Sequence, residues 1–466
     1  MRDLQCAVGG AIIRALFDSS SANRVVVTPD QDTTASPLII PRSEHRISRA
    51  NISDNALKVL YRLRSAGYEA YLVGGGVRDL SLGREPKDFD IATDARPEAV
   101  RELFRNCRLI GRRFRLAHVH FGPEIIEVAT FRALHDPADP DDGEERVVED
   151  GLILRDNVYG TLTEDALRRD FTINALYYNI ADFSVVDHAG GMADLEAGVV
   201  RLIGDPAVRY REDPVRMLRA VRFAVKLGFR IEPSTGDPIP ELAPLLAQIP
   251  SARLFEESLK LLMAGMGLET FEMLRRYGLF AQLFPGVEAA LERDQFGTGI
   301  QFISRALQNT DERIAEGKPV TPTFLFAALL WPAVQAAARP YLEQGMDEYV
   351  ALQEAAQTVL LDQVQRVGIP KRFSIPMREI WGLQPRFERR QGKRAQRLLT
   401  HPRFRAAYDF MLLRCAVGEV AQEVGEWWTQ FIDGGDEQRQ ALTAETSEAT
   451  PRRRRRRRRK KAAGGE

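Results

Sequence analysis

Two aspartates, Asp88 and Asp90, stand two residues apart in the segment Lys87–Thr93. Successive side chains on a strand point to opposite faces, so both carboxylates are predicted to project from one face, with Phe89 on the other. Carboxylates this close repel each other unless a cation lies between them, and one or two carboxylates together with substrate phosphates typically hold Mg²⁺. The pair predicts a magnesium site, although an isolated Asp-x-Asp is more often a solvated strand edge.

A glycine-rich turn precedes these aspartates. Residues 70–73 predict a short strand, Gly74, Gly75 and Gly76 form a turn, and residues 77–82 predict one or two helical turns. Backbone without a Cβ can approach a phosphate closely, and a helix N-terminus favours an anion. The turn lacks the G-x-G-x-x-G spacing of a dinucleotide-binding loop. A phosphate cradle beside metal-binding carboxylates indicates nucleotide chemistry.

A third carboxylate is predicted on a nearby strand. Glu127 interrupts the apolar run of residues 125–131, which makes it a buried-looking acid that could complete a metal cage. The alternative is an edge strand with a solvated glutamate. His118 and His120 also share a strand face, but with no third ligand nearby we interpret them as core or RNA-facing side chains.

A charged string follows at residues 163–174. Arg168 with Arg169 supplies cations for a triphosphate, and Asp170 with Asn174, one turn later, supplies an acid and an amide for a sugar or a metal-bound shell. A charged helix start would explain Arg168 alone.

A second polar set lies in a predicted helix, where Asp213, Arg216 and Arg219 fall along one face. Adenine and cytosine both offer a ring-nitrogen acceptor beside an amino donor, so a carboxylate plus a guanidinium can pair with either base. An ordinary surface salt-bridge ladder is the alternative for any one pair. The set narrows the nucleotide substrate to ATP or CTP and does not distinguish between these two.

The net charge differs between the main part of the chain, which is acidic, and its C-terminal end, which is basic. The formal charge of the 466 residues is zero, but ten cations lie between Arg452 and Lys461, so residues 1–450 carry −9. Three scattered cysteines support neither a disulfide framework nor a zinc site, which fits a reducing cytoplasm. The longest apolar run, residues 324–338, is too short to span a membrane and is interpreted as a core helix.

Two basic stretches are candidate RNA-binding surfaces. Residues 386–405 hold eight Lys or Arg against the single Glu388, and their proposed contacts are Arg389, Arg390, Lys393 and Arg394. A solvated helix face explains this composition equally well. The terminal run that includes Arg452 and Arg453 has no apolar residue to bury and is expected to be a disordered polyanion-binding arm.

The glycine turn, Arg78-Asp79, Leu82-Gly83 and Asp-Phe-Asp together closely resemble the signature of the class II nucleotidyltransferases, the superfamily of bacterial poly(A) polymerases and CCA-adding enzymes. The segments 111–121 and 154–157, the long body after residue 240 and the arginine-rich end are more similar to the poly(A) polymerases. The implied fold is α+β, with a small mixed-sheet nucleotidyltransferase head followed by an all-helical neck and body. The expected parts are a disordered arm (1–40), a catalytic head (41–195), a helical neck with the base-reading motif (196–265), a helical RNA-binding body (266–440) and a disordered tail (441–466).

The resemblance implies a polynucleotide adenylyltransferase that adds AMP from ATP to RNA 3′ ends without a template, by two-metal-ion transfer that releases pyrophosphate. Asp88, Asp90 and Asp170 would be its catalytic acids, and Asp88, Asp90 and Glu127 would hold two Mg²⁺ ions. The nucleotide-binding set would be Gly74, Gly75, Arg78, Arg168, Asn174, Asp213, Arg216 and Arg219. RNA 3′ ends, ATP and RNA-decay or RNA-chaperone proteins are the expected partners, with no membrane. The alternatives are a CCA-adding tRNA nucleotidyltransferase and a noncatalytic RNA-binding adaptor.

Overall fold

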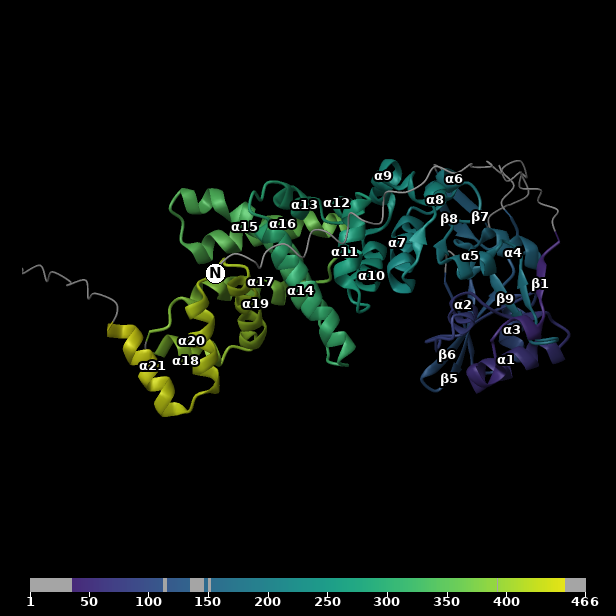
Figure 1. Cartoon of the computed structure of the whole chain (residues 1–466), viewed down its shortest axis with the longest axis horizontal. Helices are drawn as coiled ribbons and strands as arrows, with labels where there is room; N and C mark the ends of the chain where they lie inside the picture. The colour runs from purple at the N-terminus through teal and green to yellow at the C-terminus, as the bar shows by residue number, and fades with distance from the viewer. Residues whose placement is uncertain (1–35, 112–114, 135–145, 150–151, 392, 449–466) are drawn as a thin grey trace, which may run out of the picture. The chain divides into compact units, whose positions relative to one another are not determined.

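The computed structural model describes residues 36–111, 115–134, 146–149, 152–391 and 393–448. Within these ranges one eight-stranded mixed sheet occurs near the start of the chain, and helices dominate the rest (Figure 1). This arrangement confirms the α+β prediction of a mixed-sheet head followed by a helical neck and body.

The head sheet has the strand order β1-β10-β9-β2-β3-β6-β5-β4. Its strands are β1 (Leu38–Ile40), β2 (Ala70–Val73), β3 (Asp90–Thr93), β4 (Cys107–Ile110), β5 (Leu116–Phe121), β6 (Glu124–Thr130), β9 (Leu176–Asn179) and β10 (Val185–Asp187). Neighbouring strands are antiparallel except β3 and β6, which run parallel and align Asp90 with Glu127. This pairing brings two acids that are far apart in the sequence onto one face of the sheet.

Helices cover both faces of the head sheet. On one face, α1 (Asp54–Ser65) and α3 (Pro97–Leu103) pack over a core that includes Leu72, Ile91 and Val128. Ser53 caps α1 by accepting a hydrogen bond from the Ala56 N–H at 3.1 Å, as its position before the helix predicts. On the other face, α4 (Leu162–Arg168) packs over a smaller core that contains Val73 and Ala92. Because side chains alternate along β3, Asp90 belongs to the face that α4 covers.

Shorter elements complete the head. They are α2 (Gly75–Ser81), the hairpin β7 (Arg146–Glu149) and β8 (Leu152–Asp156), the 3-10 helices η1 (Arg42–Glu44), η2 (Arg49–Asn51) and η4 (Thr172–Asn174), and α5 (Gly191–Ala197). A capping box fixes the start of α4, where Thr161 and Glu164 bond to each other's backbone N–H groups.

The neck lies between the head and the body and is not entirely helical. It contains β11 (Val199–Val200), α6 (Pro206–Glu212), α7 (Val215–Leu227), β12 (Arg230–Ile231), α8 (Pro233–Gly236), α9 (Ile239–Leu242), η5 (Ala243–Gln248) and α10 (Ser251–Leu262). The pair β11–β12 is parallel and corrects the prediction of helices only.

The body is helical throughout its described residues. Its helices are α11 (Gly267–Arg276), α12 (Leu279–Leu283), α13 (Pro285–Glu292), α14 (Thr298–Ala315), α15 (Pro322–Glu343), α16 (Glu348–Arg366), α17 (Lys371–Phe387), α18 (Lys393–Leu399), α19 (Phe404–Ala416), α20 (Gln422–Asp433) and α21 (Asp436–Glu448). The apolar run at residues 324–338 lies in α15, and most of its side chains are buried, which confirms a core helix. No helix among the described residues is long and apolar enough to cross a bilayer.

Two predicted boundaries are wrong. The arm was expected to end at residue 40, but β1 already pairs with β10. The tail was expected to be disordered from residue 441, whereas α21 continues to Glu448. In both cases short-range composition outweighed pairing or helix continuation that the pattern does not reveal.

Candidate active site

Gly74 joins β2 to α2 in a conformation that favours glycine. Its φ of 72° and ψ of −136° lie in a region that side chains with a Cβ rarely adopt, and α2 begins at the next residue. A Cβ built on Gly74 would lie 3.7 Å from Oδ2 of Asp90 and 3.6 Å from Nη1 of Arg169. The predicted turn of three glycines is therefore confined to Gly74, since Gly75 and Gly76 already belong to α2. It lies directly beside Asp90, one of the three predicted metal-binding acids.

Phe89 and Asp90 face opposite sides as predicted, although the strand starts only at Asp90 and leaves Asp88 before it. Phe89 is buried in the larger core of the head, Asp88 is exposed, and Asp90 is partly buried at the first residue of β3. The pKa of Asp90 is raised to about 6, mainly because burial disfavours the charged form and also because Glu127 and Asp88 are negative neighbours. A cation bound beside Asp90 would stabilise the charged form of this carboxylate.

Glu127 lies beside Asp90 but is not buried. Its side chain is about half exposed, and its Oε1 lies 3.2 Å from Nε2 of His118 on β5. The prediction of a buried acid is wrong, because Glu127 shares its strand face with the exposed Ile125 while Ile126 and Val128 fill the core. The register with Asp90 still leaves Glu127 as a negative neighbour of the site.

Arg169 is the cation that faces Asp90, and it was absent from the predicted nucleotide-binding set. Nε of Arg169 donates to the Tyr177 hydroxyl at 2.8 Å, and Nη2 donates to Oδ2 of Asp165 at 3.1 Å. These bonds fix the guanidinium so that its charge lowers the pKa of Asp90 against the effect of burial. Arg168 points elsewhere and donates Nη1 to the Ala133 carbonyl at 2.5 Å. The adjacent Arg-Arg pair was the available signal, and the sequence alone does not say which arginine faces the acids.

Arg78 and Asn174 lie inside the protein and join separate elements. Arg78 is 2% exposed, donates Nε and Nη2 to Oδ1 of Asp79 and donates Nη1 to Oδ1 of Asn174 at 2.7 Å. Asn174 donates Nδ2 to Oδ1 of Asp170 at 3.2 Å. The hydrogen bonds of Arg78 and Asn174, which were predicted to bind the nucleotide, are made to other protein side chains.

Asp170 is held on both carboxylate oxygens. Oδ2 accepts from Nε of Arg219 at 2.6 Å, and Oδ1 accepts from the Phe171 N–H at 2.8 Å. Burial alone would raise the pKa of Asp170, but Arg219, Asn174 and the Phe171 N–H together lower it to about 2. Asp170 therefore links the head to α7 of the neck.

The predicted base-reading residues do not share one helix. Asp213 lies between α6 and α7 with an extended backbone, which corrects the prediction that Asp213, Arg216 and Arg219 follow one helix face. Oδ2 of Asp213 accepts from Nη2 of Arg253 at 2.8 Å, and Nη1 of Arg216 donates to Oε2 of Glu212 at 2.8 Å. Pro214, which follows Asp213, starts the new helix and separates the acid from the two arginines.

The donor set fits a divalent cation that is completed by a ligand. Among the described residues no group of three or more His, Cys, Asp or Glu side chains is arranged to hold a metal ion. Asp88 and Asp90 remain as the acidic pair, and the raised pKa of Asp90 marks a carboxylate without adequate compensation. One or two carboxylates plus phosphate oxygens form a usual magnesium shell.

Three family models match the chain in succession. They are described as the poly A polymerase head domain (residues 70–201), a probable RNA and SrmB-binding site of polymerase A (residues 228–291) and the polymerase A arginine-rich C-terminus (residues 344–461). Poly(A) polymerase I of Salmonella typhimurium is 53% identical over 93% of this chain and 93% of its own length. Poly(A) polymerase I of Haemophilus influenzae is 46% identical over 89% and 92%.

The chain belongs to the bacterial poly(A) polymerase family. It is thus a member of a nucleotidyltransferase family, as its motifs indicated. A CCA-adding enzyme of Bacillus pumilus is 38% identical over 52% of this chain and 58% of its own length. The crystal structure of a Bacillus stearothermophilus CCA-adding enzyme in complex with CTP has a TM-score of 0.52 at 26% identity, covering 84% of this chain and 82% of that one.

Within this poly(A) polymerase family chain, the head-domain match contains the acids at 88, 90, 127 and 170 and the glycine turn. The match to the arginine-rich C-terminus contains Arg389, Arg390, Lys393 and Arg394. Arg389 lies 3.5 Å from Asp347, and the guanidinium of Arg390 lies 5.5 Å from the ring centre of Trp427. Lys393 and Arg394 are exposed on α18. Arg452 and Arg453 lie outside the described residues.

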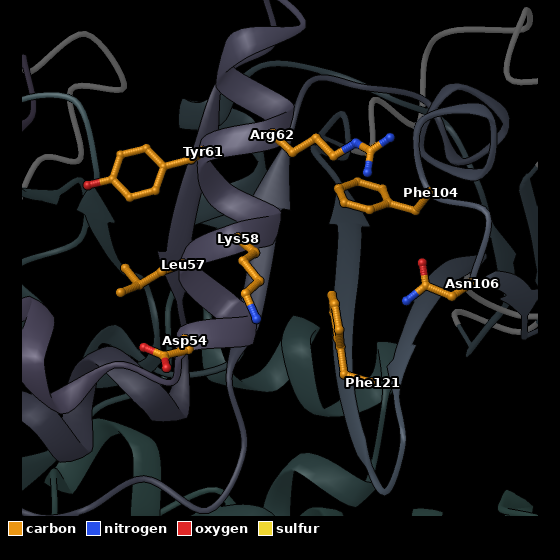
Figure 2. Close-up of a pocket in the computed structure, with 8 residues that line it drawn as sticks. All are labelled: Asp54, Leu57, Lys58, Tyr61, Arg62, Phe104, Asn106 and Phe121. Carbon is orange, nitrogen blue, oxygen red and sulfur yellow. The ribbon is translucent and has the colours of Figure 1, made fainter.

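A separate cavity of about 620 Å³ opens on the side of the head that α1 covers. Figure 2 shows Lys58 and Arg62 leaving α1 toward Phe104 and Phe121, with the Arg62 guanidinium 5.2 Å from the ring centre of Phe104. Asp88, Asp90 and Glu127 do not line this cavity. It lies on the sheet face opposite Asp90 and is not the site of nucleotide chemistry.

Proposed function

We propose that the chain adds AMP from ATP to RNA 3′ ends without a template. The observation that carries the proposal is the placement of Asp90, whose carboxylate with a raised pKa lies beside Gly74 and Arg169. The family relationship supports AMP transfer over other nucleotide chemistry, because relatives named poly(A) polymerase I match nearly the whole chain.

The reaction is an in-line displacement at the α-phosphorus of ATP. The RNA 3′-hydroxyl oxygen bonds to this phosphorus while the bond to the bridging oxygen of the pyrophosphate breaks, and the hydroxyl loses its proton. Two Mg²⁺ ions held by Asp88 and Asp90 would lower the pKa of the attacking hydroxyl and neutralise the leaving pyrophosphate. Pyrophosphate leaves as the second product.

The protein residues would bind and orient the triphosphate. The lack of a Cβ at Gly74 leaves room beside Asp90, and Gly75 is the first residue of α2, whose N-terminus would favour an anion. Arg169 offers a fixed cation on the same side, whereas Arg168 would support the neighbouring segment through its bond to Ala133. Arg78, Asn174 and Asp170 would act as positioning residues, since their contacts run through the protein interior.

Base selection would rest on Asp213 and Arg216. Oδ2 of Asp213 accepts from Arg253, so pairing through this oxygen would require Asp213 to exchange Arg253. Arg216 is held through Nη1 by Glu212 and the Arg209 carbonyl, so a base would pair with its other guanidinium nitrogens. Because adenine and cytosine present the same edge to this pair, a CCA-adding activity is the second candidate, and the likeness to CCA-adding structures favours it. By sequence, the CCA-adding enzyme of Bacillus pumilus matches only about half of the chain, whereas relatives named poly(A) polymerase I match nearly all of it, which supports poly(A) synthesis as the first candidate.

The partners that this function requires are RNA 3′ ends and ATP. The match to a probable RNA and SrmB-binding site supports RNA binding by residues 228–291. RNA-decay and RNA-chaperone proteins remain predicted partners, and the cytoplasm remains the predicted location.

The test is incubation of the purified protein with unstructured RNA, Mg²⁺ and each nucleoside triphosphate separately. ATP should extend the RNA strongly, CTP poorly, and GTP or UTP not at all. RNA binding without extension by any triphosphate would contradict the proposal and support a noncatalytic adaptor.

A further inference from the structure

Two adjoining hollows lie on the body, remote in sequence from the head acids. The first, which we call the Tyr349 hollow, has a volume of about 240 Å³ and is lined by residues that include Tyr349, Gln353, Ile375, Gly382, Arg386 and His401. The second, the arginine hollow, has a volume of about 270 Å³ and is lined by Arg386, Arg389, Arg394, Arg397 and Leu398. Arg386 lines both, so the hollows are neighbours.

The arginine hollow carries a concentrated and largely uncompensated charge. Four of its five lining residues are arginines. Arg386, Arg394 and Arg397 are exposed and form no ion pair with another described residue. Within the described part of the chain, the ion-pair partner of Arg389 is the half-exposed Asp347 at 3.5 Å, a pairing that is worth little in water. A guanidinium cluster of this kind recognises phosphate, because each planar fork can donate two parallel hydrogen bonds.

The Tyr349 hollow offers flat and apolar groups instead. Tyr349 is 40% exposed and Ile375 is 57% exposed, although both are large apolar side chains. The guanidinium of Arg386 lies 5.5 Å from the Tyr349 ring centre, so the arginine shared by the hollows is itself near an aromatic face. Aromatic rings and guanidinium planes are the groups on which unstacked bases of single-stranded RNA stack.

The floor of the Tyr349 hollow depends on a glycine. A Cβ built on Gly382 of α17 would lie 2.7 Å from Nε2 of Gln353 and 3.2 Å from Cε2 of Tyr349 on α16. The absence of a side chain there lets α16 and α17 approach closely and leaves the space between Tyr349 and Ile375 open. The hollow therefore results from the packing of two helices, not from a loose loop.

We propose that the two hollows form one binding site for single-stranded RNA, with a backbone phosphate in the arginine hollow and an adjacent base against Tyr349 and Ile375. The inference deepens the proposed function by assigning part of the RNA path. The site is sequence-tolerant, because every base has a flat face and the phosphate carries no sequence information. Sequence-tolerant binding suits an RNA strand that must move through the site as nucleotides are added to its 3′ end.

The first test measures binding of a fluorescent 20-nucleotide RNA of mixed sequence to the full chain at several salt concentrations. Arg394→Glu/Arg397→Glu should weaken binding at least tenfold and reduce the salt slope by about 0.7 for each phosphate that the variant no longer neutralises. The matched control is Arg293→Glu/Arg339→Glu, which changes the net charge equally at two exposed arginines that line neither hollow. Equal decreases in affinity for the two double variants would overturn the phosphate assignment.

The second test separates stacking from charge. Tyr349→Ala should weaken RNA binding on the order of tenfold while leaving the salt slope unchanged, because it removes a stacking surface and no cation. Since Tyr349 is partly exposed, the variant should keep the wild-type melting temperature. Unchanged RNA affinity in Tyr349→Ala would overturn the base assignment, and binding of an acidic peptide in place of RNA would assign the hollows to a protein partner.

Failure of this inference is distinguishable from failure of the proposed function. With ATP and saturating RNA, Arg394→Glu/Arg397→Glu should retain the wild-type kcat and show a raised KM for the 20-nucleotide RNA. If wild type extends RNA with ATP and the variant has an unchanged KM, only the binding site is wrong. If wild type does not extend RNA, the proposed function itself is wrong, and the binding measurements still decide the hollows.

Discussion

Asp170 of the head and Arg219 of the neck form an ion pair in which Nη2 of Arg219 lies 2.5 Å from Oδ2 of Asp170. The pair connects residues 49 positions apart and continues through Asn174 to Arg78. A chain of buried and partly buried polar groups therefore joins α2, next to the glycine turn, to α7, next to Asp213. The positions of the triphosphate and of the proposed base-selecting residues should depend on each other through this connection.

Asp170→Asn should destabilise the protein by about 2 kcal/mol at pH 7, because it leaves the partly buried Arg219 guanidinium without its charged hydrogen-bond acceptor. The folded-state pKa of Asp170 lies at about 2, below its ordinary value, so the stabilisation is present above the ordinary carboxyl pKa and is lost as the pH falls toward about 2. Urea unfolding should show the full difference from wild type at pH 7 and a smaller one at pH 3.

The matched control for Asp170 is Glu316→Gln, which breaks the exposed ion pair to Lys318. Its urea midpoint should equal that of wild type. A decrease in stability for Asp170→Asn no larger than that of the control would contradict the account of this connection.

Asp90→Asn should abolish nucleotide addition without unfolding the head, since it removes a cation ligand and opens no cavity. The raised pKa of Asp90 means that its charge costs stability in the metal-free protein at pH 7.5. The variant should therefore melt no lower than wild type, and Mg²⁺ with ATP should raise the melting temperature of wild type only. Near wild-type turnover in Mg²⁺ would disprove the metal assignment.

At sub-saturating Mg²⁺ the rate of nucleotide addition should fall as the pH drops through about 6, because protons and the cation compete for the Asp90 carboxylate. Burial is the largest cause of the raised pKa, and the charge of Glu127 adds to it. Glu127→Gln should therefore shift the acidic limb of the pH–rate profile to lower pH while keeping activity at pH 8. Complete loss of activity at pH 8 would instead show that Glu127 binds the metal.

Gly74→Ala should impair nucleotide addition beyond what its small loss of stability explains. Both Gly74 and Gly67 have positive φ, so alanine at either position should cost about 1 kcal/mol through backbone strain. A Cβ at Gly67 meets nothing within 4 Å, whereas a Cβ at Gly74 would stand between Asp90 and Arg169. Gly67→Ala is thus the control, and equal KM values for ATP in the two variants would contradict a phosphate cradle at Gly74.

The spacing of residues along the chain was sufficient to predict features that are formed by residues close together in the sequence. The turn at Gly74, the opposite directions of Phe89 and Asp90 and the cap at Ser53 depend on residues within one or two turns of each other. The strand expected to carry His118 and His120 is β5, whose apolar residues alternate with them.

The features of the site that the sequence did not predict depend on contacts between residues far apart in the chain. The parallel register that places Glu127 beside Asp90 arises from a crossover between β3 and β6, and no local pattern encodes it. The partner of Asp213 is Arg253, 40 residues later, on a different helix. The choice of Arg169 over Arg168 as the cation beside Asp90 depends on Tyr177 and Asp165, whose positions are fixed only in the folded head.

The most direct measurement gives the purified protein ATP and CTP together with Mg²⁺ and either an unstructured RNA or a tRNA that lacks its 3′ end, and sequences the products. Asp213 and Arg216 cannot by themselves distinguish adenine from cytosine, so the products must decide. We expect long homopolymeric A tails on the unstructured RNA. Addition of C, C and A to the tRNA followed by arrest, with the unstructured RNA left unextended, would contradict it.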